Sequence, residues 1–176
     1  MKNSMIKVNS LVLLSSCALI IGCTNQNTVT QNNIKPVSNA CQKIDLLIKA
    51  SHNNFDDMKQ SQVKSKSTRI WKAKYDLVGD NCQIWTLASN QLTYSCRIDI
   101  DSEELAQQYY SSAKKTTRQC LDDSWLDSEE NRVNDAGLKT IFSHKNESAN
   151  VSAHIVPSRA AFKQQWTVYY YIGASK

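Results

Sequence analysis

The sequence is poor in the residues and motifs that mark the best-known catalytic folds. It has 4 Gly, 2 Pro and 3 His in 176 residues, and it contains neither a Gly-x-Gly-x-x-Gly segment nor a P-loop, so a phosphate-cradling loop is not expected. It also lacks the Gly-x-Ser-x-Gly elbow of serine hydrolases and any Cys-x-x-Cys pair. Nucleotide-binding, α/β-hydrolase, thioredoxin-like and zinc-ribbon classes are therefore not indicated.

The three histidines do not form a recognisable ligand or catalytic set. They are His52, His144 and His154, and no third ligand stands at a zinc-site spacing from any two of them. His144 and His154 fall on consecutive expected strands, where a shared metal or general-base role is conceivable. Surface or packing roles are the stronger expectation. We expect no catalytic residue, no metal and no cofactor, and a protein that is not an enzyme.

An acidic segment at residues 121–137 carries six carboxylates but lacks the residue order of an EF-hand loop. A solvated loop is expected there rather than a calcium site. Trp125 and Leu126 interrupt the segment and are expected to plug the edge of the core.

The first 23 residues have the organisation of an export signal. Lys2 and Lys7 bound a short basic segment, and an apolar run covers residues 11–21. This run is shorter than the roughly 20 apolar residues that a membrane span needs, and it is typical of a secretory signal.

The end of this signal, Ile20-Ile21-Gly22-Cys23, resembles the lipobox of bacterial lipoproteins. The resemblance implies that a diacylglycerol is attached to the Cys23 thiol, that the chain is cleaved before Cys23, and that the new amino group is acylated. Thr24, where an Asp would favour inner-membrane retention, implies the outer membrane of a Gram-negative cell, facing the periplasm. Two or three acyl chains form a stable membrane anchor.

This segment has two alternative interpretations. One is an ordinary secreted protein cleaved elsewhere, for which no Ala-x-Ala-like site is evident nearby. Cys17 is a second thiol in the segment, but it lies within the apolar run behind Ser15-Ser16, which is a poor lipobox. Cys23 is therefore the expected lipid-attachment residue.

The chain then divides into residues 1–22 as signal peptide, 23–38 as lipidated Cys and flexible tether, and 39–176 as a single domain. The tether is rich in Asn, Gln, Thr and Ser and has too little apolar surface to fold. Removal of Lys2 and Lys7 lowers the formal charge from +5 to +3. This value does not indicate a nucleic-acid partner.

The pattern of apolar residues predicts an α+β domain with two helices packed on one face of an antiparallel sheet, in the order α-β-β-β-α-β-β-β. The expected helices cover residues 40–58 and about 101–120, with Asp101 as a candidate cap. The expected strands are residues 70–78, 82–88, 92–100, 138–144, 151–156 (closed by Pro157) and 165–172. Residues 59–69 and 121–137 are expected to be loops.

Four cysteines lie in the expected domain, and four thiols in an oxidising compartment allow three disulfide pairings. A hairpin turn centred on Ser89 would place Cys82 directly opposite Cys96, close to the distance that a disulfide needs. Antiparallel helices would bring Cys41, in a first turn, to Cys120, in a last turn. The favoured pairs are Cys82–Cys96 and Cys41–Cys120.

Three consecutive tyrosines, Tyr169, Tyr170 and Tyr171, place rings on both faces of the last strand. One face must be core, and the other is a candidate interface, since Tyr is enriched in protein interfaces. Together with the lipobox this favours a membrane-anchored envelope lipoprotein with a non-enzymatic binding or accessory role toward a protein or envelope component. The alternatives are an immunity or inhibitor protein against a periplasm-acting toxin or hydrolase, an envelope enzyme with an unrecognised site, and a structural protein.

Overall fold

A computed structural model describes residues 37–87, 90–133, 135–160 and 163–173. The expected signal peptide, Cys23 and nearly all of the tether lie outside the described residues. Among the helices that are described, none is long and apolar enough to cross a membrane.

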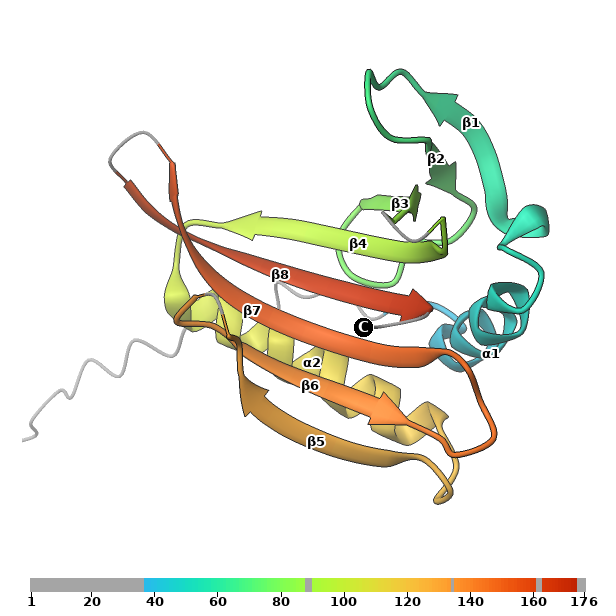
Figure 1. Cartoon of the computed structure of the whole chain (residues 1–176). Helices are drawn as coiled ribbons and strands as arrows, with labels where there is room; N and C mark the ends of the chain where they lie inside the picture. Colours follow the sequence, from blue (N-terminus) through green and yellow to red (C-terminus); the bar gives the residue numbers. More distant parts are fainter. Residues whose placement is uncertain (1–36, 88–89, 134, 161–162, 174–176) are drawn as a thin grey trace, which may run out of the picture. The chain divides into compact units, whose positions relative to one another are not determined.

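The described chain forms one eight-stranded antiparallel sheet and two helices (Figure 1). Each helix precedes four strands. The first half contains α1 (Ala40–Ser51), β1 (Lys59–Val63), β2 (Ile70–Ala73), β3 (Asn81–Thr86) and β4 (Leu92–Ile100), and the second contains α2 (Glu103–Cys120), β5 (Leu126–Asn131), β6 (Leu138–Ser143), β7 (Asn150–Ala160) and β8 (Lys163–Gly173). The strand order β1-β2-β3-β4-β8-β7-β6-β5 joins the halves through β4 and β8.

This architecture confirms the expected α+β class, with two helices on one face of an antiparallel sheet, but the sheet has two strands more than expected. The additional strands are β1 and β5, which were both expected to be loops. Each lies at an edge of the sheet. All residues of β5 are exposed, and β1 has only half-buried residues at its two ends. Since neither strand buries a face, neither has the alternating apolar pattern by which a strand is recognised.

Helix α1 ends at Ser51, short of the expected residue 58. Asn54 and Phe55 adopt left-handed backbone conformations, with φ of 59° and 58°. The Phe55 N–H donates to the Ala50 carbonyl at 2.7 Å, which satisfies an orphan carbonyl at the helix end. Asn tolerates this conformation well, so the Asn-rich segment after the helix stops it. The helical spacing of apolar residues extends past Ser51 because Phe55 and Met58 also pack into the core. Met58 ends a short 3-10 helix, Asp56–Met58.

The expectation that Pro157 closes its strand is wrong, because β7 continues to Ala160. Pro157 lies opposite Trp166 of β8, whereas the ladder to β6 ends at Ile155. At Pro157 the strand therefore has a neighbour on one side only. A proline is tolerated there because one side of the strand needs no donor.

Three smaller expectations also need correction. The two strands before β4 are shorter than expected and end at Ala73 and Thr86. Helix α2 is capped by Ser102 rather than Asp101, since the Ser102 hydroxyl accepts from the Leu105 N–H at 3.3 Å. Trp125 is buried as expected, but Leu126 is 73% exposed.

The core lies between the helices and the inward face of the sheet. The largest fully buried side chains there include Tyr94 of β4 and Tyr170 of β8. The Tyr94 hydroxyl donates to the Tyr75 carbonyl at 2.9 Å, and the Tyr170 hydroxyl pairs with that of Thr117 in α2 at 2.7 Å. Both buried phenols thus have hydrogen-bond partners, and burial raises the pKa of each.

The structure contains the two disulfides that the sequence favoured. Strands β3 and β4 have the expected register, with Cys82 opposite Cys96, and these two residues are bonded. Cys41 in the first turn of α1 is bonded to Cys120 at the end of α2, with their Cα atoms 4.7 Å apart. One bridge locks a hairpin and the other locks the helix pair.

Candidate functional site

The histidines do not come together. His154 lies opposite Lys139 on β6, whereas His144 lies beyond the end of that strand. The His144 ring contacts Trp125, with 5.5 Å between ring centroids, and His52 Nε2 lies 2.8 Å from a Glu147 carboxylate oxygen. No group of three or more His, Cys, Asp or Glu residues suited to a metal ion occurs in the described part of the chain.

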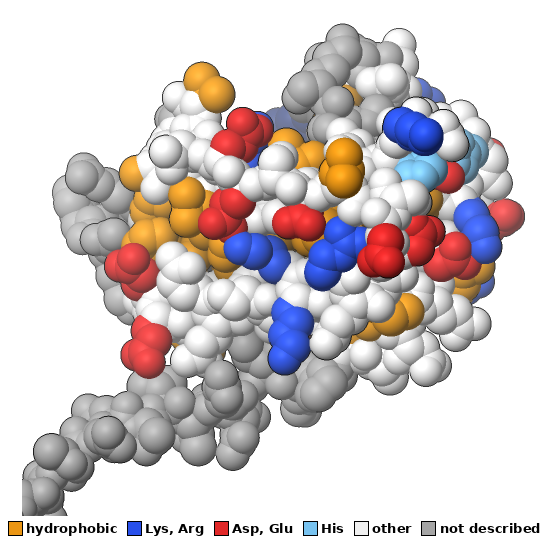
Figure 2. Space-filling model, turned by 90° about the horizontal axis from the view of Figure 1, so that it is seen from below, with side chains coloured by type: hydrophobic (Ala, Val, Ile, Leu, Met, Phe, Trp, Pro, Cys, Tyr) orange, Lys and Arg blue, Asp and Glu red, His pale blue; other side chains and the backbone are white. Residues whose placement is uncertain are grey.

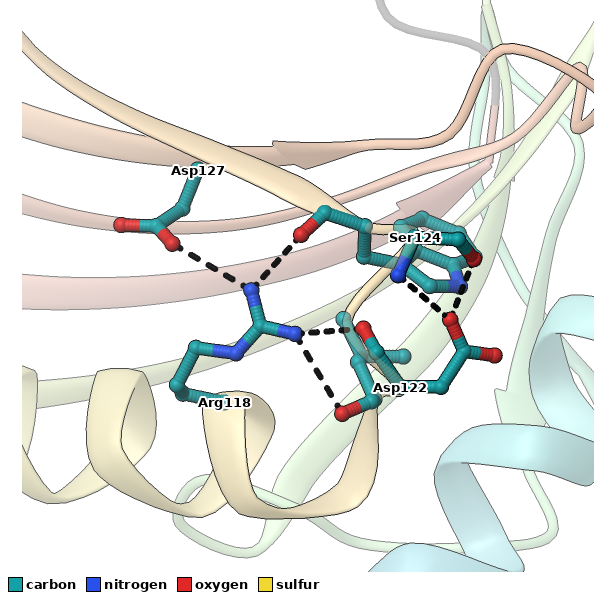
Figure 3. A network of polar contacts seen from close by, with 6 residues as sticks. Arg118, Asp122, Ser124 and Asp127 are labelled. Carbon is teal, nitrogen blue, oxygen red and sulfur yellow. Dashed lines mark hydrogen bonds and ion pairs between the residues drawn. The ribbon is translucent and has the colours of Figure 1, made fainter.

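The acidic segment is held by α2 rather than arranged around an ion. The Arg118 guanidinium donates to the carbonyl oxygens of Leu121, Asp122 and Trp125 at 3.3, 2.6 and 2.7 Å, and it pairs with Asp127 at 3.3 Å (Figure 3). This one side chain ties the end of the helix to the start of β5.

The other carboxylates of β5 are also paired with cations. Glu129 pairs with Lys114 and accepts from the Tyr110 hydroxyl at 2.8 Å, while Glu130 pairs with Lys139 at 2.9 Å. The face seen from below, where α2 and β5 lie in Figure 1, accordingly shows basic and acidic side chains side by side (Figure 2). These charges neutralise one another locally and leave no concentration of one sign.

The second face of the sheet is the more distinctive surface. Among the described residues no helix covers it, because α1 and α2 both pack on the other side. We call it the open face, and its central residues alternate with the core residues along β4, β7 and β8: Ser95, Arg97, Asp99, Ser152, His154, Thr167, Tyr169 and Tyr171.

The tyrosine triplet supplies both faces of the sheet, as expected. Tyr170 is fully buried in the core, whereas Tyr169 and Tyr171 lie on the open face and are half-buried. Their rings are stacked, with centroids 5.8 Å apart and an angle of 12° between the planes. The His154 ring meets the edge of the Tyr171 ring at a centroid distance of 5.0 Å. Burial and the neighbouring Tyr169 raise the pKa of Tyr171 to about 12, so it is a neutral phenol at pH 7.

His154 is fixed through both of its ring nitrogens. The Arg132 guanidinium contacts Nδ1, and Nε2 lies 3.0 Å from the Ser152 hydroxyl oxygen. Because arginine only donates, Nδ1 must accept, and the neutral ring carries its proton on Nε2. Arg132 is itself held by Asp135 at 2.9 Å. Burial, with the positive charges of Arg132 and Lys139, lowers the pKa of His154 to about 4.

Arg97 is the exposed cation at the centre of the open face. It lies opposite Tyr169 on β8 and Asn81 on β3, and it pairs with Asp99 at 2.5 Å. Partial burial would raise the pKa of Asp99, but hydrogen bonds from Arg97 and from the Thr167 hydroxyl lower it below its usual value. The resulting ion pair holds the guanidinium beside the tyrosines.

A groove of about 1170 Å³ lies on the helix side of the sheet. It runs between α2, the start of α1 and residues 77–80, and Ile98 and Tyr170 are among the residues that line it. Its charged side chains are Asp80, Glu104 and Lys115, all of them exposed. They do not converge on a nucleophile or base, so the residues that the structure describes form no catalytic constellation in the groove.

The open face combines stacked aromatic rings, an exposed arginine and a histidine whose two ring nitrogens are both engaged. This combination is better suited to binding than to proton transfer. The sequence identified its tyrosines, but it missed Arg97, Arg132 and Asp135. The only signal for Arg97 was its place on the polar face of the expected strand at residues 92–100.

Comparison of the chain with protein-family models, curated proteins and solved structures returned no match.

Proposed function

We propose that the protein is a lipid-anchored component of the bacterial cell envelope, and that its open face binds a protein partner without catalysing a reaction. The anchor follows from the lipobox resemblance at Cys23. The binding role rests on one observation, which is the cluster of Tyr169, Tyr171, His154 and Arg97 on a sheet face that no described helix covers.

The chemistry of this cluster favours a protein partner. Tyr and Arg are enriched among the residues that contribute most to protein–protein affinity. The tyrosine rings are already stacked and Arg97 is already held by Asp99. Little side-chain entropy is then lost when a partner docks, which increases affinity.

A binding role is favoured over general-base catalysis by the state of His154. Both ring nitrogens are engaged, by Arg132 and Ser152. Its lowered pKa, about 4, also makes it a weak base at neutral pH. The residue contributes a fixed ring surface instead.

The anchor is tested by the intact mass of membrane-extracted protein beside a Cys23→Ala variant. We expect a lipid-sized mass increase on a chain that begins at Cys23, absent from the variant. A soluble, unacylated chain cleaved at another site would refute the anchor.

The binding face is tested by photocrosslinking in intact membranes. A photoreactive residue replaces Asn81, which is exposed and lies opposite Arg97, and in a matched control it replaces Gln119, which is exposed on α2. We expect a discrete adduct from position 81 that is absent from position 119 and is lost on Arg97→Glu. Equal adducts from both positions, or none from position 81, would show that the open face is not the interface.

A further inference from the structure

The first hairpin of the sheet holds a concentration of unpaired positive charge. Residues 59–74 contain six cations and no acidic residue. Within the part of the chain that the structure describes, only Lys59 of these six forms an ion pair, with Asp56. The other five have no carboxylate partner among the described residues, and all are exposed: Lys64, Lys66, Arg69, Lys72 and Lys74.

The rest of the described domain differs in this respect. Six of its cations form ion pairs with carboxylates, with nitrogen–oxygen distances of at most 3.3 Å: Lys49, Arg97, Lys114, Arg118, Arg132 and Lys139. Lys43, Lys115 and Lys145 lack such a partner in the described structure, but they lie singly on α1, α2 and the turn after β6. The hairpin is therefore the described surface where uncompensated positive charge gathers.

Exposed apolar side chains lie next to this charge. Trp85 and Leu87 are each 39% exposed, and they are two of the four exposed large hydrophobic residues that the described structure contains. Trp85 lies directly opposite Ile70 of the hairpin, and the Thr86 N–H donates to the Arg69 carbonyl at 3.0 Å. A Trp beside lysines and arginines is the combination found at membrane–water interfaces.

We propose that this basic hairpin (residues 59–74), with Trp85 and Leu87, is a second membrane contact that binds the phosphate headgroups of anionic phospholipids. Clustered Lys and Arg near an anionic leaflet are attracted to it, and Trp and Leu insert at the level of the headgroups. The hairpin is at the end of the sheet opposite β5, and it is remote from α2 (Figure 1).

This inference rests on the proposed lipid anchor at Cys23. Thirteen residues separate Cys23 from Val37, where the described chain begins. At about 3.5 Å per residue they keep the domain within about 50 Å of the membrane, whatever their conformation. The anchor thus holds the hairpin at a high local concentration of headgroups, so that a weak electrostatic contact is sufficient.

The test uses the mature chain, residues 23–176, carrying Cys23→Ala, so that neither the apolar signal segment nor an acyl anchor contributes to binding. Its partitioning is measured by flotation with vesicles of phosphatidylcholine alone and with vesicles containing phosphatidylglycerol. We compare the triple variant Lys64→Gln/Lys66→Gln/Arg69→Gln with the matched control Lys43→Gln/Lys115→Gln/Lys145→Gln. Both remove three unpaired cations, and the first set lies in the exposed tip between β1 and β2.

We expect stronger binding to the anionic vesicles, weakened by added salt. Each cation near an anionic surface strengthens partitioning about fivefold, so the tip triple lowers it roughly 100-fold while the control changes it only a few-fold. Equal losses in the two triples, or equal binding to both vesicle types, would overturn the proposal. Neither result affects the mass measurement on Cys23, so failure of the hairpin and failure of the anchor are distinguishable. Circular dichroism verifies that both triples are folded.

Discussion

At the scale of single residues, the open face depends on side chains that hold one another in place. Arg132 is the central example: Asp135 fixes it by an ion pair at 2.9 Å, and it contacts His154, whose ring meets Tyr171. Such a chain of contacts joins the 132–137 connection to two strands. The arrangement requires that His154 remain neutral, because a protonated ring could not accept a hydrogen bond from arginine.

This requirement predicts a pH dependence of stability. The pKa of His154 is about 4 in the folded protein, below its ordinary value of 6.5. The unfolded chain therefore binds a proton more readily, and the stability that this residue contributes is present above pH 6.5 and is lost as the pH falls toward 4. We expect His154→Gln to reduce the loss of unfolding free energy between pH 7 and pH 4 by about 1–3 kcal/mol.

Urea denaturation of both proteins at several pH values measures this difference. His52→Gln is the control, since that ring is exposed beside Glu147. Parallel pH profiles of wild type and His154→Gln would contradict the assignment of a neutral, half-buried ring.

At the scale of elements, the connection from α2 to β5 depends on Arg118. It donates to three carbonyl oxygens after the helix and pairs with Asp127. We expect Arg118→Ala to lower the unfolding free energy by about 1–3 kcal/mol, because these acceptors lose a charged donor. Arg118→Lys should recover only part of this, since an ammonium lacks the planar fork.

Denaturant midpoints measure the effect, and Lys115→Ala on the same helix is the control. Lys115 is exposed and forms no ion pair with a described residue, so its loss should change stability by less than about 0.5 kcal/mol. A change of similar size in both variants would show that Arg118 does not hold the connection.

The elements that the sequence predicted are those that bury one face. Strand β4 was predicted to the residue because Leu92, Tyr94 and Cys96 alternate with polar residues, and its register with β3 followed from the hairpin. Strands β1 and β5 were missed because backbone pairing with one neighbour holds them, and pairing is independent of side-chain polarity. Helix α1 ends at a left-handed turn, and β7 continues past Pro157 because that part of the strand has a neighbour on one side only. The identity of a single residue such as Pro157 does not reveal either condition.

The candidate site was less predictable than the fold. The tyrosine triplet marked the open face because alternation in a strand must place one ring on each side. The partners Arg132 and Asp135 lie in a connection between β5 and β6, and their meeting with His154 on β7 depends on tertiary packing. No spacing along the sequence encodes that contact.

At the scale of the whole molecule, two units of one helix and four strands share one sheet, and β4 and β8 join them at its centre. The Cys41–Cys120 disulfide crosses the same boundary between the helices. The two halves are thus linked in both layers, and we expect one cooperative unfolding transition. Each half contains only one of the two helices, and alone it would leave the edge of β4 or of β8 unpaired.

The long disulfide should be the larger covalent contribution to stability. Cys41 and Cys120 are separated by 79 residues, and Cys82 and Cys96 by 14. By the loop-entropy relation the first contributes about 4.5 kcal/mol and the second about 3 kcal/mol. Urea denaturation of Cys41→Ser/Cys120→Ser measures the first term, and a loss below about 1 kcal/mol would show that this bridge does not constrain the unfolded chain.

The place of the Cys41–Cys120 bond also decides how the domain responds to mechanical load. A pull on the N-terminal chain reaches Cys41 in the first turn of α1 and passes through a covalent bond to the last turn of α2. In that turn, Arg118 donates hydrogen bonds to the backbone that leads into β5. Helix α1 cannot be peeled from the sheet from its N-terminal end while this bond is intact. Tension between the proposed membrane tether and a partner on the open face would thus enter the domain at this covalent junction of the two helices.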